Sequence, residues 1–121
     1  MNSEKVTKIL KGLYPGKNIV ALPENNPTEI ICEVEPTADH PEYSVAMAVI
    51  VESKPHFNDV TETYEVESGS LELAVNGSII ELKEGKSYTI PPGVVHSAKS
   101  NEAWVKVESR PGWTPQSHHL V

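Results

Sequence analysis

The chain has 121 residues, which is enough for one domain with a single core. Its 10 Lys and Arg residues against 17 Asp and Glu residues give a net charge of −7, and the basic residues are scattered, so we expect neither nucleic acid nor membrane partners. No apolar run approaches the roughly 20 residues of a bilayer span and no signal peptide pattern opens the chain, so we expect a cytoplasmic protein.

The N-terminus carries a helical pattern. Apolar residues recur there at the spacing of one helix face: Val6, Ile9, Leu10 and Leu13. Ser3 is placed to cap the start, and Gly12 lies near the last turn as a stop signal. We therefore predict a short amphipathic helix over residues 1–13 that covers a core.

From Tyr14 onward the apolar period changes to two, and ten prolines and seven glycines divide the chain into short extended segments. Residues 28–35 alternate in the manner of a half-buried strand, with Cys32 on its apolar face. Cys32 is the only cysteine, which excludes an internal disulfide and a multi-thiolate zinc site. Residues 44–51 are apolar on both faces, which predicts a central strand covered on both sides.

Asn76-Gly77 indicates a hairpin between residues 71–75 and 78–82, because a type I′ turn needs positive φ at both central residues. The predicted register pairs Leu71 with Leu82 and Leu73 with Ile80 on the inner face, and Glu72 with Glu81 on a solvated face. With further strands at 87–90 and 103–108, the spacing predicts an all-β barrel or sandwich.

A carboxylate in this pattern points toward the core. In residues 62–66 the apolar positions are Tyr64 and Val66, so a period of two turns Glu62 inward. An ionised and unpaired carboxylate there would cost at least several kcal/mol of desolvation. Glu62 must therefore be paired, protonated or bound to a cation.

Two histidines and an asparagine accompany this carboxylate. His56 and Asn58 are two residues apart and share a strand face. His96 follows Pro91-Pro92-Gly93, a rigid turn that sets the direction of the imidazole. These residues form the candidate site.

The same residues resemble the two motifs of the cupin family. The first reads His56-x-Asn58-x3-Glu62-x6-Gly69, with Ile50 where a leading glycine is expected. The second reads Gly85-x5-Pro91-x-Gly93-x2-His96, with Asn101 one residue late. The resemblance implies a single cupin jelly-roll domain: a helix over 1–13, a barrel over 28–108 and a C-terminal tail over 109–121.

Segments beside the motifs are similar to small single-domain cupins loosely labelled mannose-6-phosphate isomerase-like. They are Pro55-His56-Phe57-Asn58, Thr61-Glu62-Thr63-Tyr64 and Pro111-Gly112-Trp113. That label is a weak guide to the activity of this chain, because proteins with the cupin barrel catalyse many different reactions. Cupins of this size usually pair through their sheets, so the resemblance also implies a homodimer.

In cupins the motif histidines and the glutamate bind a divalent metal. Asn58 stands where the second histidine is expected, and its amide oxygen is a weak or vacant ligand compared with imidazole. His56, Glu62 and His96 remain as a set that suits iron, manganese, nickel or zinc. The alternative is a barrel that has lost its metal and binds a ligand through a polar patch. We favour the metal, because both imidazoles and the inward carboxylate are present together.

Other polar residues are candidates for the site. Tyr64 and Tyr88 either supply hydroxyls for proton transfer and substrate orientation or serve as core aromatics. Lys54 and Arg110 are the cations expected near the barrel mouth. The tail carries two further histidines, His118 and His119, which join the site only if the tail packs across the barrel. His40 is expected in a loop without a role.

Three functions follow. The first is a metal-dependent enzyme on a small polar metabolite, with isomerase or epimerase chemistry on a sugar favoured and Glu62 and Tyr64 as the catalytic candidates. The second is a non-heme iron dioxygenase built on the same ligands. The third is a metal-free module that binds or senses a small molecule.

Overall fold

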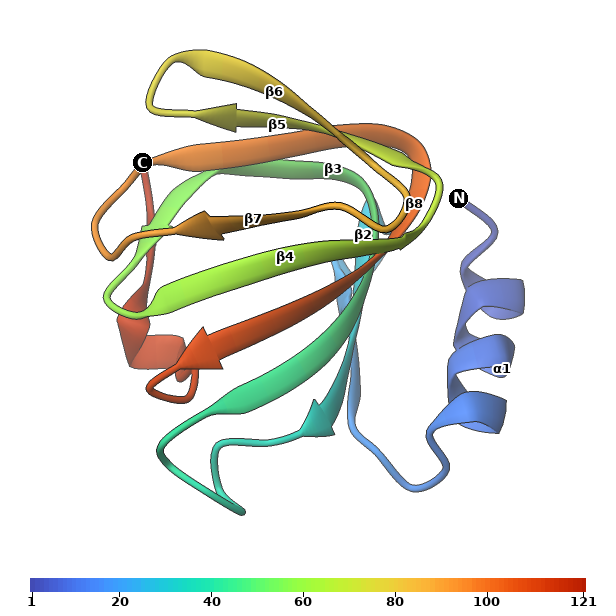
Figure 1. Ribbon diagram of the computed structural model, residues 1–121. Coiled ribbons are helices and arrows are strands. Elements are labelled where there is room, and N and C mark those ends of the chain that lie inside the picture. Colours follow the sequence, from blue (N-terminus) through green and yellow to red (C-terminus); the bar gives the residue numbers. More distant parts are fainter.

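One N-terminal helix and nine strands make up most of the chain, and the strands curl into a jelly-roll barrel (Figure 1). The computed structural model describes residues 1–121. In chain order the elements are α1 (Ser3–Leu13), β1 (Ile19–Leu22), β2 (Glu29–Glu35), β3 (Ser44–Asn58), β4 (Thr61–Ser68), β5 (Ser70–Val75), β6 (Ser78–Lys83), β7 (Ser87–Ile90), β8 (His96–Arg110), the 3₁₀ turn η1 (Pro115–Ser117) and β9 (His118–Leu120). The predicted all-β fold with one short helix is confirmed.

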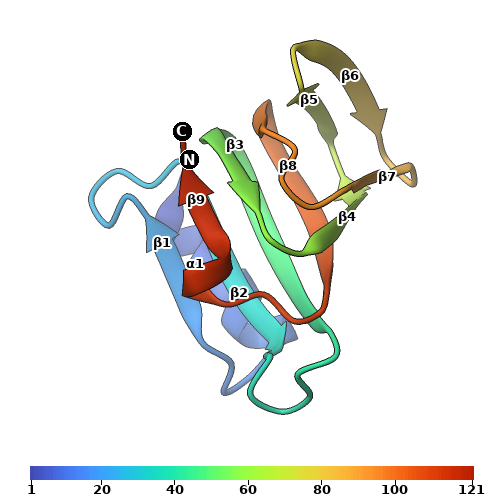
Figure 2. The ribbon, with the colours of Figure 1, turned by 90° about the vertical axis from the view of Figure 1, so that its left-hand side faces the viewer.

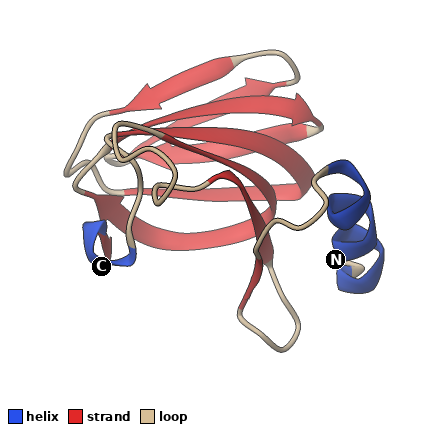
Figure 3. Cartoon of the chain, turned by 90° about the horizontal axis from the view of Figure 1, so that it is seen from below, coloured by secondary structure: helices blue, strands red, loops and turns tan.

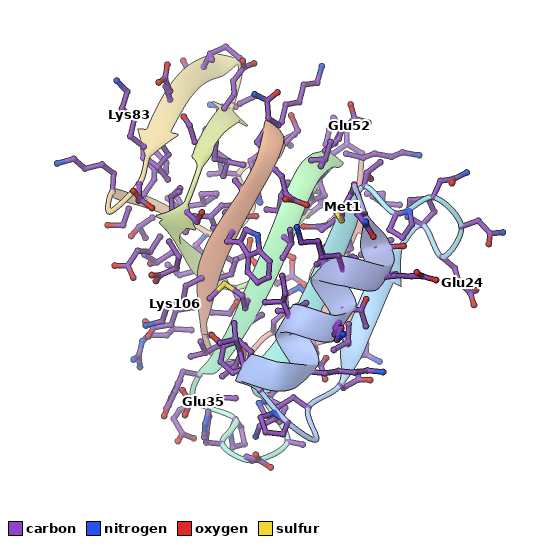
Figure 4. The ribbon with its side chains drawn as sticks, turned by 90° about the vertical axis from the view of Figure 1, so that its right-hand side faces the viewer. Met1, Glu24, Glu35, Glu52, Lys83 and Lys106 are labelled. Atoms are coloured by element: carbon purple, nitrogen blue, oxygen red, sulfur yellow. The ribbon has the colours of Figure 1, made fainter.

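Helix α1 packs on the outer face of the sheet (Figure 4). Val6 and Leu10 are buried against a cluster of residues from β2 and β3: Ile30, Cys32, Met47 and Val49. The cap prediction was wrong, because Ser3 is already helical and Asn2 is the N-cap, whose side chain accepts a hydrogen bond from the Lys5 amide at 3.1 Å. Gly12 lies inside the helix, and the Tyr14 amide bonds to the Leu10 carbonyl at the C-terminal end. No helix of the structure has the length and apolar character of a membrane span.

The strands form one sheet in the order β1-β2-β3-β8-β4-β7, with β5 and β6 added as a hairpin on β8 and with β9 added on β3. Strands β1 and β9 extend this sheet beyond the range 28–108 predicted for the barrel. Inside the barrel, buried residues from strands β3 to β8 make a second cluster, with Leu71 and Leu73 fully enclosed. The sheet therefore has a core on each side.

The hairpin prediction is confirmed in detail. Leu71 pairs with Leu82 and Glu72 with Glu81, and the two glutamates are exposed. Asn76 and Gly77 have φ values of 49° and 85°, both positive as a type I′ turn requires. A two-residue turn with this chemistry sets the register of the strands that it joins.

Strands β3 and β8 are longer than the strands predicted from the apolar stretches 44–51 and 103–108. Strand β3 continues past Val51 to Asn58, and β8 begins at His96 rather than Ala103. Their pairing shifts register between Ile50 and Glu52 and again between Ser53 and His56, where Pro55 lies. Such bulges accommodate a residue without an amide hydrogen while the strand continues. The extension carries the polar residues to one end of the barrel.

Candidate metal centre

The polar residues meet at the end of the barrel opposite α1. There β3 and β7 end, β4 and β8 begin, and the C-terminal tail runs across, at the left of Figure 1. Figure 3 shows α1 and η1 at opposite ends of the molecule. His56, Glu62 and His96 each offer a ligand atom, and these atoms all lie within 4.8 Å of one another. The structure thus brings together the three predicted metal ligands.

Strand pairing explains why these side chains meet. His56 and His96 are direct partners across β3 and β8, with ring centroids 4.2 Å apart. Glu62 alternates inward on β4 as predicted and is only 6 % exposed. The turn before His96 is held by a hydrogen bond from the Gly93 amide to the Asn58 carbonyl at 2.8 Å. Four segments therefore fix the position of the cluster.

The two histidines are oriented by backbone carbonyls. Nδ1 of His56 lies 2.7 Å from the Lys54 carbonyl, and Nδ1 of His96 lies 2.9 Å from the Val94 carbonyl. Because a carbonyl only accepts, each ring donates from Nδ1–H, and its Nε2 then carries a lone pair. This is the arrangement in which a histidine binds a metal through Nε2.

One of these nitrogens has no protein partner. His96 Nε2 is buried without a hydrogen bond and lies 3.3 Å from Oε1 of Glu62. A nitrogen lone pair that faces a carboxylate oxygen is repelled unless a proton or a metal ion lies between them. Two imidazole nitrogens and a carboxylate are donors that transition-metal ions accept, so the residues fit such an ion.

Burial changes the acid–base properties around the cluster. It lowers the pKa of the His56 imidazole, which favours the neutral form. It raises the pKa of the Tyr64 hydroxyl well above its usual value, and Glu62 and Glu29 add to this effect. The Tyr64 ring packs edge-on against His96 with centroids 5.9 Å apart. At neutral pH we therefore expect a protonated Tyr64 hydroxyl and a neutral His56 imidazole.

Glu29 is a site residue that the sequence analysis missed. Burial, with Glu62 next in effect, raises the pKa of its carboxyl to about 7, while His96 acts to lower it. Glu29 shares a face of β2 with Ile31, which packs against the barrel core. The sequence pattern placed this face toward solvent because only Ile31 on it is apolar. Helix α1 covers the opposite face of β2, so the face with Glu29 is the barrel interior.

Asn58 connects the cluster to the tail. Its Nδ2 donates to Oε1 of Glu62 at 2.8 Å, and its Oδ1 accepts from Trp113 Nε1 at 3.2 Å. The same oxygen lies 3.3 Å from Nδ1 of His118. Both polar atoms of the amide are thus engaged by protein groups, and Asn58, 3 % exposed, orients the carboxylate.

The tail packs on the site through β9, which pairs with the end of β3 (Figure 2). The His118 ring lies 4.8 Å from the His56 ring, centroid to centroid. His119 turns outward, where its Nε2 lies 2.9 Å from Oδ2 of Asp59 and its ring stacks on Phe57. Of the two tail histidines, only His118 is therefore close to the predicted ligands.

The remaining candidates lie around or away from the cluster. Tyr88 is half-buried opposite Tyr64 and packs against the barrel core. Lys54 has an exposed side chain, and its contribution is the carbonyl that orients His56. Arg110 lies over the Tyr43 ring and pairs with Glu108. His40 stacks on the same Tyr43 ring, outside the site.

A separate cleft of about 570 Å³ lies between α1 and the sheet. Ile9, Leu13 and Trp104 are among its mainly apolar lining residues. None of the candidate ligands borders it. The candidate metal ligands and this cleft therefore lie on different parts of the molecule.

Comparison with known proteins gives the family of this fold. Residues 45–104 match the family model described as the cupin domain. No curated protein sequence matches the chain significantly. Among solved structures, the Streptomyces nucleoside dehydratase Pac13 is similar at 17 % identity, with 89 % of this chain and 87 % of that chain covered and a TM-score of 0.74.

Two other structures extend the comparison. KdgF from Halomonas sp. is similar at 17 % identity, with 72 % of this chain and 83 % of that chain covered and a TM-score of 0.60. Oxalate decarboxylase from Bacillus subtilis is similar at 15 % identity, with 85 % of this chain but only 31 % of that chain covered and a TM-score of 0.70. At these identities the similarity establishes the fold alone.

Proposed function

The chain is a small cupin, and we propose that it binds a divalent metal ion through His56, Glu62 and His96 and acts on a small polar metabolite. We propose sugar-type isomerisation or epimerisation as the reaction. Both reactions take a proton from a substrate carbon and return one, to the neighbouring carbon in isomerisation and to the opposite face of the same carbon in epimerisation. They therefore need a polarising group and a side chain that exchanges protons near neutral pH.

The observation that carries the proposal is the unpaired Nε2 of His96 beside the Glu62 carboxylate. The backbone carbonyls hold both histidines in the tautomer that leaves Nε2 free for a metal. Iron, manganese, nickel and zinc all accept this donor set. When bound, such an ion supplies Lewis acidity that polarises a substrate carbonyl or hydroxyl.

The residues around the ligands supply the proton chemistry. In the metal-free chain burial raises the pKa of the Glu29 carboxyl to about 7, which makes this group the candidate for accepting and returning a proton. Tyr64, whose pKa is raised by burial, keeps its proton and is suited to donate a hydrogen bond. With Glu62 holding the metal, we assign the proton-transferring role to Glu29 and an orienting role to Tyr64.

Metal analysis of protein purified without a polyhistidine tag tests the proposal. We expect about one ion per chain, because the chain has one such cluster. His96→Ala should lose the ion, whereas His40→Ala, which removes a histidine outside the site, should retain it. Unchanged metal affinity in His96→Ala would contradict the ligand assignment. A metal-free wild type whose melting temperature is unaffected by zinc or by chelator would favour the metal-free binding module.

A second function is supported by the ligand set itself. Two histidines and one carboxylate are the donors of many non-heme iron oxygenases. Oxygen uptake by the iron-loaded protein in the presence of candidate sugars and organic acids separates this function from isomerisation, which consumes no oxygen. Substrate-dependent uptake would replace our first proposal with the dioxygenase.

A further inference from the structure

We propose that His118 of the C-terminal tail is a further ligand of the metal centre and provides the imidazole that position 58 lacks. This inference rests on the proposed metal site of His56, Glu62 and His96. It assigns to the centre a donor set of three imidazoles and one carboxylate, with one imidazole delivered from outside the two motifs.

The register of β9 places His118 beside position 58. His118 and Asn58 are direct partners in the antiparallel pairing of β3 with β9. Side chains of directly opposed residues project to the same side of a sheet. The His118 ring accordingly lies beside His56, with centroids 4.8 Å apart, on the same side as the cluster. An imidazole at 118 thus borders the space that an imidazole at 58 would enter.

The hydrogen bonds of Asn58 determine which nitrogen of His118 is free. The indole Nε1–H of Trp113 can only donate, so the Asn58 atom that it contacts must be the carbonyl oxygen. Nδ1 of His118 contacts this same oxygen and must also donate. The lone pair is therefore on Nε2, as in His56 and His96. Three histidines around the cluster share the tautomer that binds a metal.

The tail is built to hold His118 in place. Ser117 is 8 % exposed, and its hydroxyl donates to the Thr114 carbonyl at 2.7 Å and accepts from the Thr114 amide at 3.2 Å. The Ser117 carbonyl accepts from the Asp59 amide at 2.8 Å. Ordering these groups in advance lowers the entropic cost of binding an ion.

The adjacent residue provides a matched control. His119 lies on the same short strand, but its Nε2 is occupied by Asp59 and its side chain is 41 % exposed. Replacing a histidine that only stabilises β9 should leave zinc binding unchanged, as we expect for His119→Ala. Replacing a metal ligand should weaken zinc binding.

X-ray absorption of the zinc-loaded protein counts the imidazoles around the ion. We expect three per zinc in the wild type, two in His118→Ala and three in His119→Ala. Competition with a chelator should show zinc affinity about 100-fold or more lower in His118→Ala, beyond the roughly 10- to 100-fold range of residues that only orient a ligand. His119→Ala should bind zinc like the wild type.

Moving the imidazole back to position 58 gives an independent check. Asn58→His combined with His118→Ala should recover the three-imidazole count and most of the lost zinc affinity. Two imidazoles in the wild type would overturn the inference even if His118→Ala weakened binding, because His118 would then act through Asn58. Absence of zinc binding by the wild type would instead defeat the proposed metal site on which the inference rests.

Discussion

A single buried amide at position 58 links three parts of this molecule. Asn58 donates to the Glu62 carboxylate and accepts from Trp113 and His118, so it joins β3, β4 and the tail. A neutral histidine here would have a single acceptor nitrogen, which could not accept from both Trp113 and His118 as the two lone pairs of the amide oxygen do. The residue that departs from the cupin motif therefore has a structural role of its own.

Replacing Asn58 by alanine should destabilise the metal-free protein by about 1–3 kcal/mol, because a buried Glu62 oxygen and the Trp113 N–H lose their partner. Urea denaturation measures this change. Asn18→Ala is the control, since Asn18 also donates to a glutamate, Glu33, but in an exposed position, and it should cost less than about 0.5 kcal/mol. Equal losses in the two variants would contradict the linking role.

Among the secondary-structure elements, the short turns and bulges determine where a strand ends and how closely it approaches the neighbouring strand. The residue between β4 and β5 is Gly69, with φ of +86° and a position where a Cβ would lie 2.9 Å from the Glu102 carbonyl oxygen. The glycine thus allows β4 to turn into β5 directly against β8. The bulges in β3 have a comparable effect, because they let the strand pass Pro55 and deliver His56 to the barrel end.

Gly69→Ala should therefore cost more than the same change in an open turn. Gly77 has nearly the same φ, +85°, and no atom within 4 Å of a Cβ position, so Gly77→Ala should cost about 1–2 kcal/mol for conformational strain alone. The contact with Glu102 should add roughly 1–3 kcal/mol in Gly69→Ala. Equilibrium unfolding of both variants provides the comparison, and similar losses would show that the backbone of β8 moves away at little cost.

At the scale of the whole molecule, closure of the barrel gathers acidic groups that the sequence distributes over distant strands. Besides burial, the charge of Glu62 on β4 raises the pKa of Glu29 on β2, although the two residues are 33 positions apart in the chain. Helix α1 covers the other face of β2 and so directs Glu29 inward. The predicted homodimer stays a prediction, for which the exposed Leu13 beside the α1 cleft offers apolar surface.

The Glu29 carboxyl should contribute a loss of stability to the metal-free protein as pH rises toward 7. The pKa of Glu29 is about 7 in the folded chain against an ordinary value of 4.5, so between these values the folded state binds more protons than the unfolded state. Stability due to this group is then present below about pH 4.5 and lost by about pH 7, a total of up to about 3 kcal/mol.

Glu29→Gln should remove this contribution to the pH dependence and should be more stable than the wild type at pH 8. Urea unfolding at pH 5.5 and pH 8 in the presence of chelator measures both effects. Glu33→Gln, on the same strand, is the control and should retain the wild-type slope. An unchanged slope in Glu29→Gln would show that Glu29 ionises normally.

The local features of the fold and the site could be predicted from short stretches of the chain. The alternation of apolar residues predicted that Glu62 points inward, and Asn76-Gly77 predicted the hairpin register. The two motifs identified His56 and His96 as candidate ligands. Each of these predictions depends on residues that are close together in the chain. Sequence patterns could not predict the partners of Asn58, the inward direction of Glu29 or the different positions of His118 and His119 relative to the site. Those depend on which strand or helix lies across from each residue, and that pairing arises from closure of the barrel and from addition of β9 to β3.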